Sequence, residues 1–550
     1  MRNDSSARFW WLGVFVLAVV AYLYALDGLY IPHIGDEAPY IEIARLTGAS
    51  GAWLPLKTAP GFENTKPPLL YWVGIVSTHW GRHFTLFRLR LPIVLCTFLL
   101  AALVGFVTER LTKDRVRGAL GALTFLGFYS SFQYGRPFLT NQPESLFVFL
   151  SFAIFLLGRR YRERFALWMG IGISLGIACL FKSFALVAPV GLALAWVTFM
   201  ERGDFLLRDA LRIAVAVIVA LGCFAIWPLF DPEPGAILQH FVLEENLGKL
   251  GGEGYLRGLF AWPYPIYRLW LGHLGNAGFF ALPLIYLVVR SVRERKSATV
   301  DEKGLWILVL SFLIVYSVPS QRQGNYLIPT VPALSILLAM RWPSIDGRWF
   351  RLFHLPGIAM LVVLIPLMWA VRGDILPAES YASWQLAVPV IALGGWLFAT
   401  FSVRRAPHLF HALVFLSFLS LAAATAPFEG PAGRFEPEHV ARLAGRRVYV
   451  PEDFIRKRER HRFLLPGMRV EGYDPSDSDR LTHLLESGRM VVVRRAFGET
   501  ATGPFRVFAR RLELTSRHSP SEMWRIAFER DLHLLVRQEL VVRRFRRGRT

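Results

Sequence analysis

Residues 91–109 read Leu-Pro-Ile-Val-Leu-Cys-Thr-Phe-Leu-Leu-Ala-Ala-Leu-Val-Gly-Phe-Val-Thr-Glu. A helix of about 20 such apolar residues is long enough to cross the hydrocarbon core of a bilayer, so this stretch predicts a transmembrane span. The composition of the 550-residue chain agrees, since 54% of its residues are hydrophobic and only 19% are charged. These values, with a mean hydropathy of +0.38, exclude an ordinary soluble protein.

Similar stretches recur along the chain and predict a polytopic α-helical membrane protein with about thirteen spans. The first follows Arg2 and Arg8 and lacks a small-x-small cleavage site, which indicates a retained anchor rather than a cleaved signal. The expected spans lie near residues 9–30, 91–109, 118–134, 143–158, 165–181, 184–200, 210–230, 274–289, 304–319, 326–340, 353–371, 384–402 and 408–426.

Basic residues predict the orientation of these spans. The loops after the even-numbered spans carry Lys and Arg, the first group being Arg110, Lys113, Arg115 and Arg117. Because short basic loops stay on the cytoplasmic side, we expect the N-terminus in the cytoplasm, and an odd number of spans places the C-terminus outside. Much of the net charge of +21 is therefore a topology signal, and no nucleic-acid partner is expected.

Two long loops, residues 31–90 and 231–273, interrupt the apolar pattern on the extracytoplasmic side. Loops of this length are usually functional. Within the first, Glu37–Leu46 and Leu69–Trp80 combine helical apolar spacing with Trp and Tyr, which is typical of helices at the membrane interface. We expect a membrane domain, residues 1–426, that carries its site in these two loops.

The composition changes from residue 427 onward. This tail holds 26 Lys and Arg against 17 Asp and Glu, and its short β-rich runs are separated by Gly, Pro and Asp turns, which predicts a small α/β unit. Residues 427–550 are therefore expected to form a soluble extracytoplasmic domain. Its β-rich runs are Arg447–Val450, Met490–Val493, Phe505–Phe508 and Leu534–Val542.

Two carboxylates, Asp36 and Glu37, follow the first span at the membrane boundary. Charged groups in such a setting are costly unless they are used or paired. The alternative is a helix N-terminus, where acidic residues complement the helix dipole. In the second half of the same loop, Lys66 precedes Pro67-Pro68 and an interfacial helix, and a fixed cation there is suited to bind a phosphate.

This loop, ending in Arg90-Leu91-Pro92, resembles the first loop of polyprenyl-phosphate-sugar glycosyltransferases with the C-type membrane fold. The nearest groups are the aminoarabinose transferases that modify lipid A and the protein O-mannosyltransferases. Later segments are also similar to motifs of that family, and the resemblance covers roughly residues 1–345. These segments are Leu180–Pro189 (Leu-x-Lys-Gly-Pro in the family), Glu244-Glu245-Asn246 (Glu-Asn) and Asn325–Pro332 (Tyr-Leu-x-Pro-x-x-Pro).

The resemblance implies an enzyme of the bacterial inner membrane. Such an enzyme moves a sugar from a polyprenyl (undecaprenyl) phosphate donor to an extracytoplasmic acceptor, which can be lipid A, a glycan or a protein hydroxyl. By position, Asp36 matches the catalytic or acceptor-contacting Asp, with Glu37 beside it. Lys66 and Tyr326 match residues that hold the donor phosphate, and Arg268 is a looser counterpart of a phosphate-binding Arg.

Two further cations are candidate ligands of the donor phosphate. Lys182 lies between two apolar segments where no cytoplasmic loop explains it, so it either touches a ligand or caps a helix end. Arg322 lies next to the Tyr326 segment and leaves the same choice. Candidate acceptor-binding or supporting residues are Arg88, Arg136, Asn141, Glu144, Glu245 and Asn246.

The chain departs from the family pattern at the second acidic position, where Asn141 stands in place of an Asp. Either Asn141 only forms hydrogen bonds or Glu144 takes the acidic role. Thr65 also stands where aminoarabinose transferases tend to have an acidic residue, which leaves the acceptor open.

The expected chemistry needs few groups. A carboxylate such as Asp36 can act as general base toward an acceptor hydroxyl, whereas a phosphate acceptor needs only positioning. Because cations stabilise the departing lipid phosphate, no metal cofactor is required, although His33, Asp36 and Glu37 could hold a divalent cation. His33 is alternatively an interfacial hydrogen-bonding residue.

Two other functions are compatible with the same composition. A transporter or flippase of a lipid-linked sugar would place polar groups along a pathway through broken helices. A non-catalytic accessory subunit would not need the Asp36 and Lys66 pair.

Overall fold

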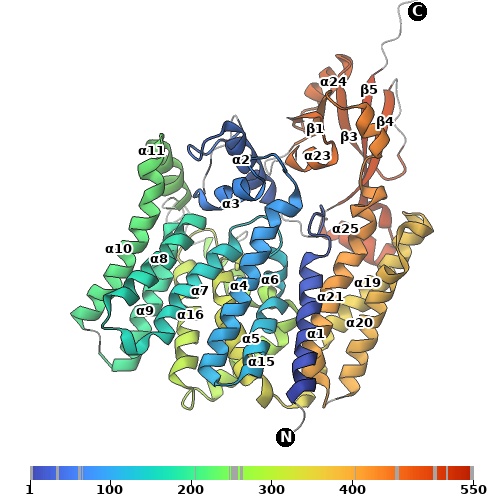
Figure 1. The fold of residues 1–550 in the computed structure, drawn as a ribbon. Coiled ribbons are helices and arrows are strands. Elements are labelled where there is room, and N and C mark those ends of the chain that lie inside the picture. The colour runs from blue at the N-terminus through green and yellow to red at the C-terminus, as the bar shows by residue number, and fades with distance from the viewer. Residues whose placement is uncertain are drawn as a thin grey trace, which may run out of the picture. The chain divides into compact units, whose positions relative to one another are not determined.

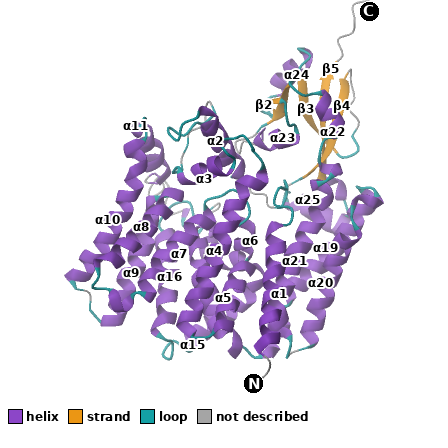
Figure 2. Cartoon of the chain, viewed as in Figure 1, coloured by secondary structure: helices purple, strands orange, loops and turns teal. Residues whose placement is uncertain are grey.

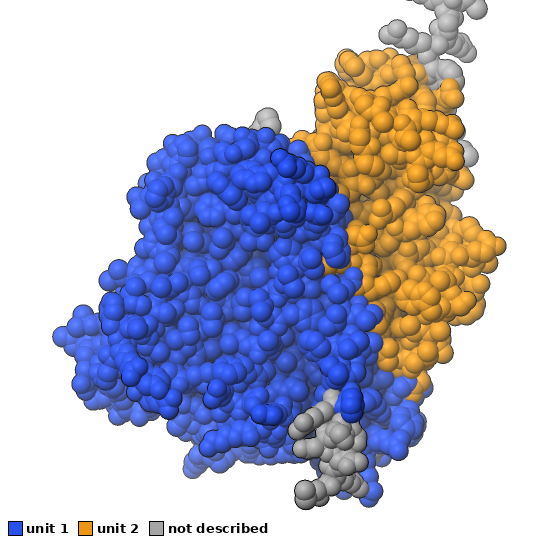
Figure 3. Space-filling model, in the orientation of Figure 1, with its two compact units in different colours: residues 1–23, 43–358, 395–415 blue, residues 24–42, 359–394, 416–550 orange. Residues whose placement is uncertain are grey.

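A computed structural model describes residues 4–31, 36–59, 64, 66–204, 206–246, 248, 258–260, 264–402, 404–452, 458–499, 505–515 and 518–544. The chain divides into two compact units (Figure 3). The first comprises Met1–Leu23, Ile43–Ile358 and Gly395–Phe415, and the second comprises Tyr24–Glu42, Ala359–Gly394 and Leu416–Thr550.

The first unit is a bundle of apolar helices joined by short turns (Figures 1 and 2). Several helices begin at a side chain that caps them: Thr85 accepts a hydrogen bond from the backbone N–H of Arg88, and Asp114 accepts one from that of Val116. The main helices are α1 (Asp4–Leu23), α4 (Leu86–Thr112), α5 (Arg115–Gly127), α7 (Asn141–Leu157), α8 (Phe165–Phe181), α9 (Val187–Arg202), α10 (Leu207–Phe230), α15 (Ala281–Arg293), α16 (Val300–Ser317) and α17 (Val331–Arg341).

Glycines allow α8 and α10 to approach closely. A Cβ at Gly172 would meet the carbonyl oxygen of Ala216 at 2.7 Å, and one at Gly176 would meet Cys223 Cβ at 2.5 Å. Small residues of this kind are typical of helix contacts in membranes, where backbones pack without a hydrophobic driving force.

The chain is a polytopic helical membrane protein. Among the described residues, seven helices are long and apolar enough to cross a bilayer, and every span expected from sequence overlaps at least one helix. The count of about thirteen crossings stays a prediction. The seven are Leu86–Thr112, Phe184–Arg202, Leu207–Phe230, Ile266–Arg293, Gly347–Asp374, Ser383–Phe401 and Ala406–Glu429.

Shorter elements lie in the two long loops. In the first loop, α2 (Glu37–Ser50) and α3 (Leu69–Ser77) confirm the two helices expected there. In the second, a π-helix (Ile237–Asn246) follows α10, and α13 (Ile266–Trp270) and α14 (Gly272–Ala277) lead back to the bundle.

The second unit contains parts of α19 (Leu355–Asp374), α20 (Ser383–Phe401) and α21 (Ala406–Glu429), and a five-stranded sheet of order β2-β1-β3-β5-β4. β1 pairs in parallel with β2 and β3, whereas β5 is antiparallel to β3 and β4. The strands are β1 (Arg447–Pro451), β2 (Arg469–Tyr473), β3 (Met490–Ala496), β4 (Phe505–Leu514) and β5 (Val536–Arg544), and the helices among and before them are α22 (Pro437–Arg442), α23 (Arg458–Leu464), α24 (Ser478–Glu486) and α25 (Pro520–Trp524).

All four β-rich runs expected from sequence overlap strands, and β2 is the strand that the sequence pattern missed. Its five residues, Arg-Val-Glu-Gly-Tyr, contain a glycine and two charges and so lack a clear strand signal. Pairing with β1 supplies the stability that the local sequence does not. The domain boundary expected at residue 427 stays a prediction.

A buried charge cluster lies within this sheet. Glu539 is fully buried and pairs with Arg511 at 2.6 Å, with Arg494 at 3.0 Å and with His461 at 3.1 Å. Burial by itself would raise the pKa of the Glu539 carboxyl, but the charges of Arg511, His461 and Arg494 hold that pKa well below its usual range. The carboxylate therefore stays ionised inside the sheet.

Candidate functional site

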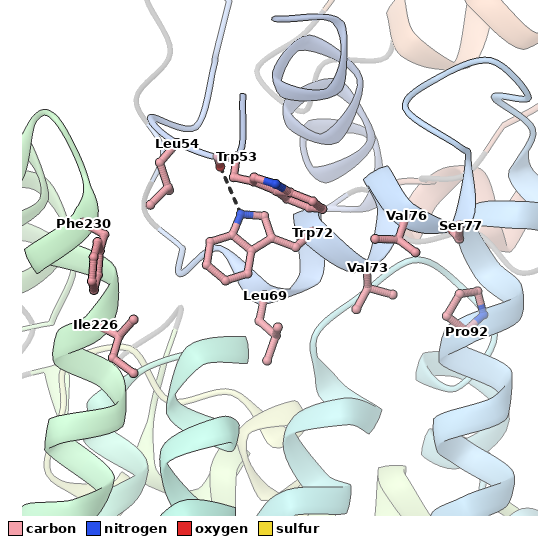
Figure 4. Close-up of a pocket in the computed structure, with 10 residues that line it drawn as sticks. All are labelled: Trp53, Leu54, Leu69, Trp72, Val73, Val76, Ser77, Pro92, Ile226 and Phe230. Atoms are coloured by element: carbon pink, nitrogen blue, oxygen red, sulfur yellow. Dashed lines mark hydrogen bonds between the residues drawn. The ribbon is translucent and has the colours of Figure 1, made fainter. Parts of the chain in front are cut away.

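An apolar groove opens in the first unit between α3, α4 and α10 (Figure 4). Its volume is about 740 Å³. The indole N–H of Trp72 donates to the carbonyl of Trp53 at 3.0 Å, and this hydrogen bond fixes one wall of the groove. The groove is lined by Trp53, Leu54, Leu69, Trp72, Val73, Val76, Ser77, Pro92, Ile226 and Phe230. Both long loops border it, since α3 lies in the first and α10 ends where the second begins.

Lys66 lies three residues before Leu69, which lines this groove. Asn64 holds the local backbone, because its Oδ1 accepts from the Lys66 N–H at 3.1 Å and its Nδ2 donates to the Lys66 carbonyl at 2.6 Å. The same Oδ1 accepts from the hydroxyl of Tyr71 at 3.1 Å. The ammonium of Lys66 lies 2.6 Å from Glu245 Oε1 in the second loop.

Glu245 and Asn246 end the π-helix and connect two parts of the chain. Whereas Glu245 pairs with Lys66, the Oδ1 of Asn246 accepts from the hydroxyl of Ser183 at 2.7 Å. The Nδ2 of Asn246 donates to the carbonyl of Phe241 at 2.6 Å, which fixes the amide. The Glu-Asn pair noted in the sequence therefore links the Lys66 segment to the Lys182 segment.

Lys182 ends α8 and pairs with Glu144, whose side chain is buried in the first turn of α7, at 2.9 Å. The Lys182 ammonium also lies 5.7 Å from the centre of the Tyr326 ring, and that ring packs against Tyr316. The position of Lys182 fits the helix-end interpretation, because a cation at a helix C-terminus complements the dipole, and the ammonium also faces an aromatic ring. Its contact with a ligand stays a prediction.

Together these residues form what we call the two-lysine cluster: Asn64, Lys66, Glu144, Lys182, Ser183, Glu245, Asn246 and Tyr326. In the part of the chain that the structure describes, each lysine pairs with a carboxylate, so the cluster holds cations in place. A phosphate could bind by sharing or replacing those carboxylates as partners, since oxyanions and ammonium groups form strong charge-assisted hydrogen bonds.

At the second acidic position, the Glu144 carboxylate pairs with Lys182. Whether Glu144 takes the acidic role in the reaction stays a prediction. Asn141 is buried at the start of α7, where its carbonyl accepts from the Ser145 hydroxyl at 2.6 Å.

Arg322 is fully buried and donates to backbone carbonyls. Its Nε reaches Ser317 at 2.8 Å, and its Nη1 reaches Gly258 and Tyr264 at 3.2 Å each. It thus anchors the second loop, while Arg268 is exposed beside the Tyr264 ring at 5.7 Å. A phosphate-binding role for either arginine stays a prediction.

Arg136 and Arg88, two of the candidate supporting residues, make different contacts. The buried Arg136 donates from Nε to the carbonyl of Tyr22 at 3.0 Å and stacks over the Phe132 ring at 4.6 Å. Arg88 is half-buried in the first turn of α4 and gives its backbone N–H to Thr85. Arg136 thus satisfies a carbonyl in the last turn of α1 and packs on an aromatic ring, and its supporting role at the site stays a prediction.

Asp36 and Glu37 belong to the second unit. Asp36 is exposed in a turn directly before α2, and Glu37 is the buried first residue of that helix. Glu37 therefore occupies the dipole-complementing position that the sequence left as an alternative, whereas the exposed carboxylate of Asp36 can meet a substrate. His33 lies outside the described residues, among which no group of three or more His, Cys, Asp or Glu side chains could hold a metal ion.

Asn64 and Ser183 were missed from sequence, although each lies within two residues of a predicted lysine. Their signal was available, since Asn and Ser beside a helix start commonly bond to the backbone. Ser183 accepts from the Ala185 N–H at 3.1 Å.

Residues 35–231 match the family model of dolichyl-phosphate-mannose-protein mannosyltransferases. The chain is 26% identical over 428 residues to an undecaprenyl phosphate-alpha-4-amino-4-deoxy-L-arabinose arabinosyl transferase 2 of Pseudomonas fluorescens, covering 72% of this chain and 68% of the relative. It is 23% identical to the enzyme of that name from Proteus mirabilis, covering 72% of each chain.

Solved structures share the fold. ArnT from Cupriavidus metallidurans bound to undecaprenyl phosphate superposes with a TM-score of 0.63 at 18% identity, covering 88% of this chain and 92% of that one. The apo form of the same protein has a TM-score of 0.60 and covers 97% and 98%. The resemblance inferred from the sequence motifs is confirmed, and the chain is a polytopic membrane protein of the C-type glycosyltransferase fold, related to the polyprenyl-phosphate-sugar glycosyltransferases.

Proposed function

We propose that this chain is an integral membrane glycosyltransferase that moves a sugar from undecaprenyl phosphate to an extracytoplasmic acceptor. The observation that carries the proposal is the apolar groove of about 740 Å³ that begins three residues after Lys66. A lipid phosphate has one apolar and one anionic part. An apolar groove suits the first part, and a fixed cation suits the second.

The cations of the two-lysine cluster serve the leaving group. Transfer forms a bond between the acceptor oxygen and the anomeric carbon and breaks the bond from that carbon to the phosphate oxygen. The lipid phosphate leaves with one more negative charge than it carried in the donor, and cations placed in advance stabilise this charge. We assign Lys66, Lys182 and Tyr326 to this phosphate, with Arg268 and Arg322 as further candidates.

The acceptor side uses Asp36. With a hydroxyl acceptor, the Asp36 carboxylate takes the proton as the oxygen attacks, and with a phosphate acceptor it only orients the attacking group. Glu37 supports the turn that carries it. Supporting roles fall to Glu144 as the second acidic residue and to Arg88, Arg136, Asn141, Glu245 and Asn246.

The reaction as proposed needs no metal, since the lysines neutralise the phosphate. We also propose about thirteen spans in the inner membrane, a cytoplasmic N-terminus, and an α/β domain at residues 427–550 on the periplasmic side. The alternation of basic loops supports this orientation.

The test is a transfer assay with purified protein, undecaprenyl phosphate-4-amino-4-deoxy-L-arabinose as donor and lipid A as first acceptor. Other glycan and peptide acceptors follow in the same assay. Lys66→Gln should raise the donor KM about 10- to 100-fold, because a charge-assisted bond to phosphate is lost. Lys296→Gln, which removes an exposed lysine after α15, is the matched control.

Absence of transfer by the parent protein with every donor and acceptor pair would overturn the proposal. Movement of the labelled lipid across proteoliposomes without transfer would instead identify a transporter or flippase. EDTA treatment that abolishes transfer would overturn the metal-free mechanism alone.

A further inference from the structure

Within the second unit, residues of the C-terminal part of the chain contact the segment Tyr24–Glu42 on both sides of Asp36 and Glu37. On the N-terminal side the contact is made at Tyr30, six residues before Asp36. The Tyr30 hydroxyl accepts from the backbone N–H of Leu514 on β4 at 3.3 Å and from Arg511 Nη1 at 3.4 Å. The guanidinium of Arg460 lies 4.5 Å over the Tyr30 ring.

Glu429, at the end of α21, holds the same segment through its backbone. Its two carboxylate oxygens accept from the N–H groups of Leu29 and Tyr30 at 2.6 Å each. This approach needs a glycine before Leu29, because a Cβ at Gly28 would lie 2.6 Å from Glu429 Oε1. The backbone is therefore fixed where it leaves α1.

On the C-terminal side the contact is made at Glu42, five residues after Glu37 on α2. Glu42 is fully buried, and Arg458 at the start of α23 donates to it from Nε at 3.0 Å and also from Nη2. Arg458 pairs at the same time with Glu452, which follows β1, at 3.2 Å. One arginine thus connects α2 to the sheet.

These contacts select particular partner groups, which general apolar packing would not do. A buried ion pair contributes little net stability compared with apolar packing, but it defines which groups must meet. Here a buried ion pair, Glu42 with Arg458, follows the two carboxylates. Before them, Tyr30 is held by Arg511, which Glu539 in turn holds in the sheet.

We infer that the C-terminal segment, residues 429–544, positions the Asp36-Glu37 turn for the transfer reaction, with Arg458 as the principal positioning residue. The inference rests on the proposed function, because it assigns the turn a role in transfer. Displacement of a reacting group by about 1 Å can cost about a hundredfold in rate.

The test uses the full-length protein with Arg458→Ala, Arg458→Lys and the isosteric Glu42→Gln. The control is Arg442→Ala, which removes an exposed arginine of α22 that pairs with the exposed Glu438. Arg458→Ala and Glu42→Gln should each lower kcat about 10- to 100-fold and leave the donor KM within about twofold. Arg458→Lys should recover most of the lost kcat because it keeps the charge.

A second measurement does not depend on activity. Hydrogen exchange of peptides covering residues 36–42 should speed up about tenfold or more in Arg458→Ala and Glu42→Gln, while peptides from β3 and β5 keep their protection. Loss of protection in β3 and β5 would show that a variant unfolds the domain. Glu42→Gln leaves the Arg458–Glu452 pair intact, so its exchange at residues 36–42 would then decide the inference.

Unchanged exchange at residues 36–42 in Glu42→Gln would overturn the inference, as would faster exchange with unchanged kcat. Failure of the proposed function has a different signature, namely no transfer by the parent protein. The exchange measurement would then still decide whether the C-terminal segment holds the turn.

Discussion

The ammonium of Lys66 lies 2.6 Å from Glu245 Oε1, although 179 positions separate the two residues. This ion pair joins the two long loops, and Asn246 extends the connection to Ser183 beside Lys182. The loops that border the apolar groove are therefore joined by charge at the point where a lipid phosphate is proposed to bind.

Glu245→Gln should increase the affinity for undecaprenyl phosphate about three- to tenfold. In the parent protein the Glu245 carboxylate competes with the phosphate for Lys66, and a neutral amide competes less. The affinity can be measured by microscale thermophoresis in detergent, with the exposed pair variant Glu438→Gln as control. A weaker affinity would mean that Glu245 acts by holding Lys66 in place.

Asp36→Asn should lower kcat at least about a hundredfold with a hydroxyl acceptor, since an amide cannot accept the proton. Glu37→Gln should lower kcat much less, because Glu37 is buried in the first turn of α2. The measurement is the rate of transfer at saturating donor. Equal rates for Asp36→Asn and the parent would remove the base role.

Val73→Trp should narrow the groove and raise the KM of a 55-carbon donor at least about fivefold. Val73 lines the groove on α3 (Figure 4), and added volume excludes chain atoms that would otherwise be buried at about 25 cal/mol per Å². A donor with a ten-carbon chain should be affected less. The matched control is Val292→Trp, at an exposed position on α15; equal effects on both donors would place the lipid elsewhere.

Glu539→Gln should destabilise the second unit by about 3–5 kcal/mol, because it leaves Arg511 and Arg494 buried without their central carboxylate. Thermal unfolding followed by circular dichroism of the full-length protein, with Glu486→Gln as an exposed control, measures the effect. A loss below about 1 kcal/mol would show that Glu513, which also contacts both arginines, is enough.

The same carboxylate predicts a pH dependence. Its pKa is well below the usual range in the folded protein, so its stabilising contribution is present above the ordinary Glu pKa and is lost as pH falls toward the folded pKa. The unfolding temperature of the parent should drop more steeply below about pH 4.3 than that of Glu539→Gln. Parallel curves for both proteins would contradict this assignment.

Local sequence patterns were enough for the membrane class, the two helices of the first long loop and four of five strands, whereas the helices of the second loop were not predicted. Hydrophobic periodicity and composition report on each segment by itself, and a long apolar helix such as α4 or a β-branched strand such as β3 needs no distant partner to be recognised. Motif resemblance also placed Lys66, Lys182, Glu245, Asn246 and Tyr326 on a single list of candidates, although it left their contacts open.

Tertiary structure alone decided which charges meet. The sequence shows the sign of a charge but not its partner, because Coulomb attraction depends on distances that the fold sets across tens or hundreds of positions. The fold paired Lys182 with Glu144, turned Arg322 toward backbone carbonyls, and brought Arg458 of the C-terminal segment onto Glu42. β2 followed the same logic, since a strand with weak local propensity forms only when a neighbouring strand completes its hydrogen bonds.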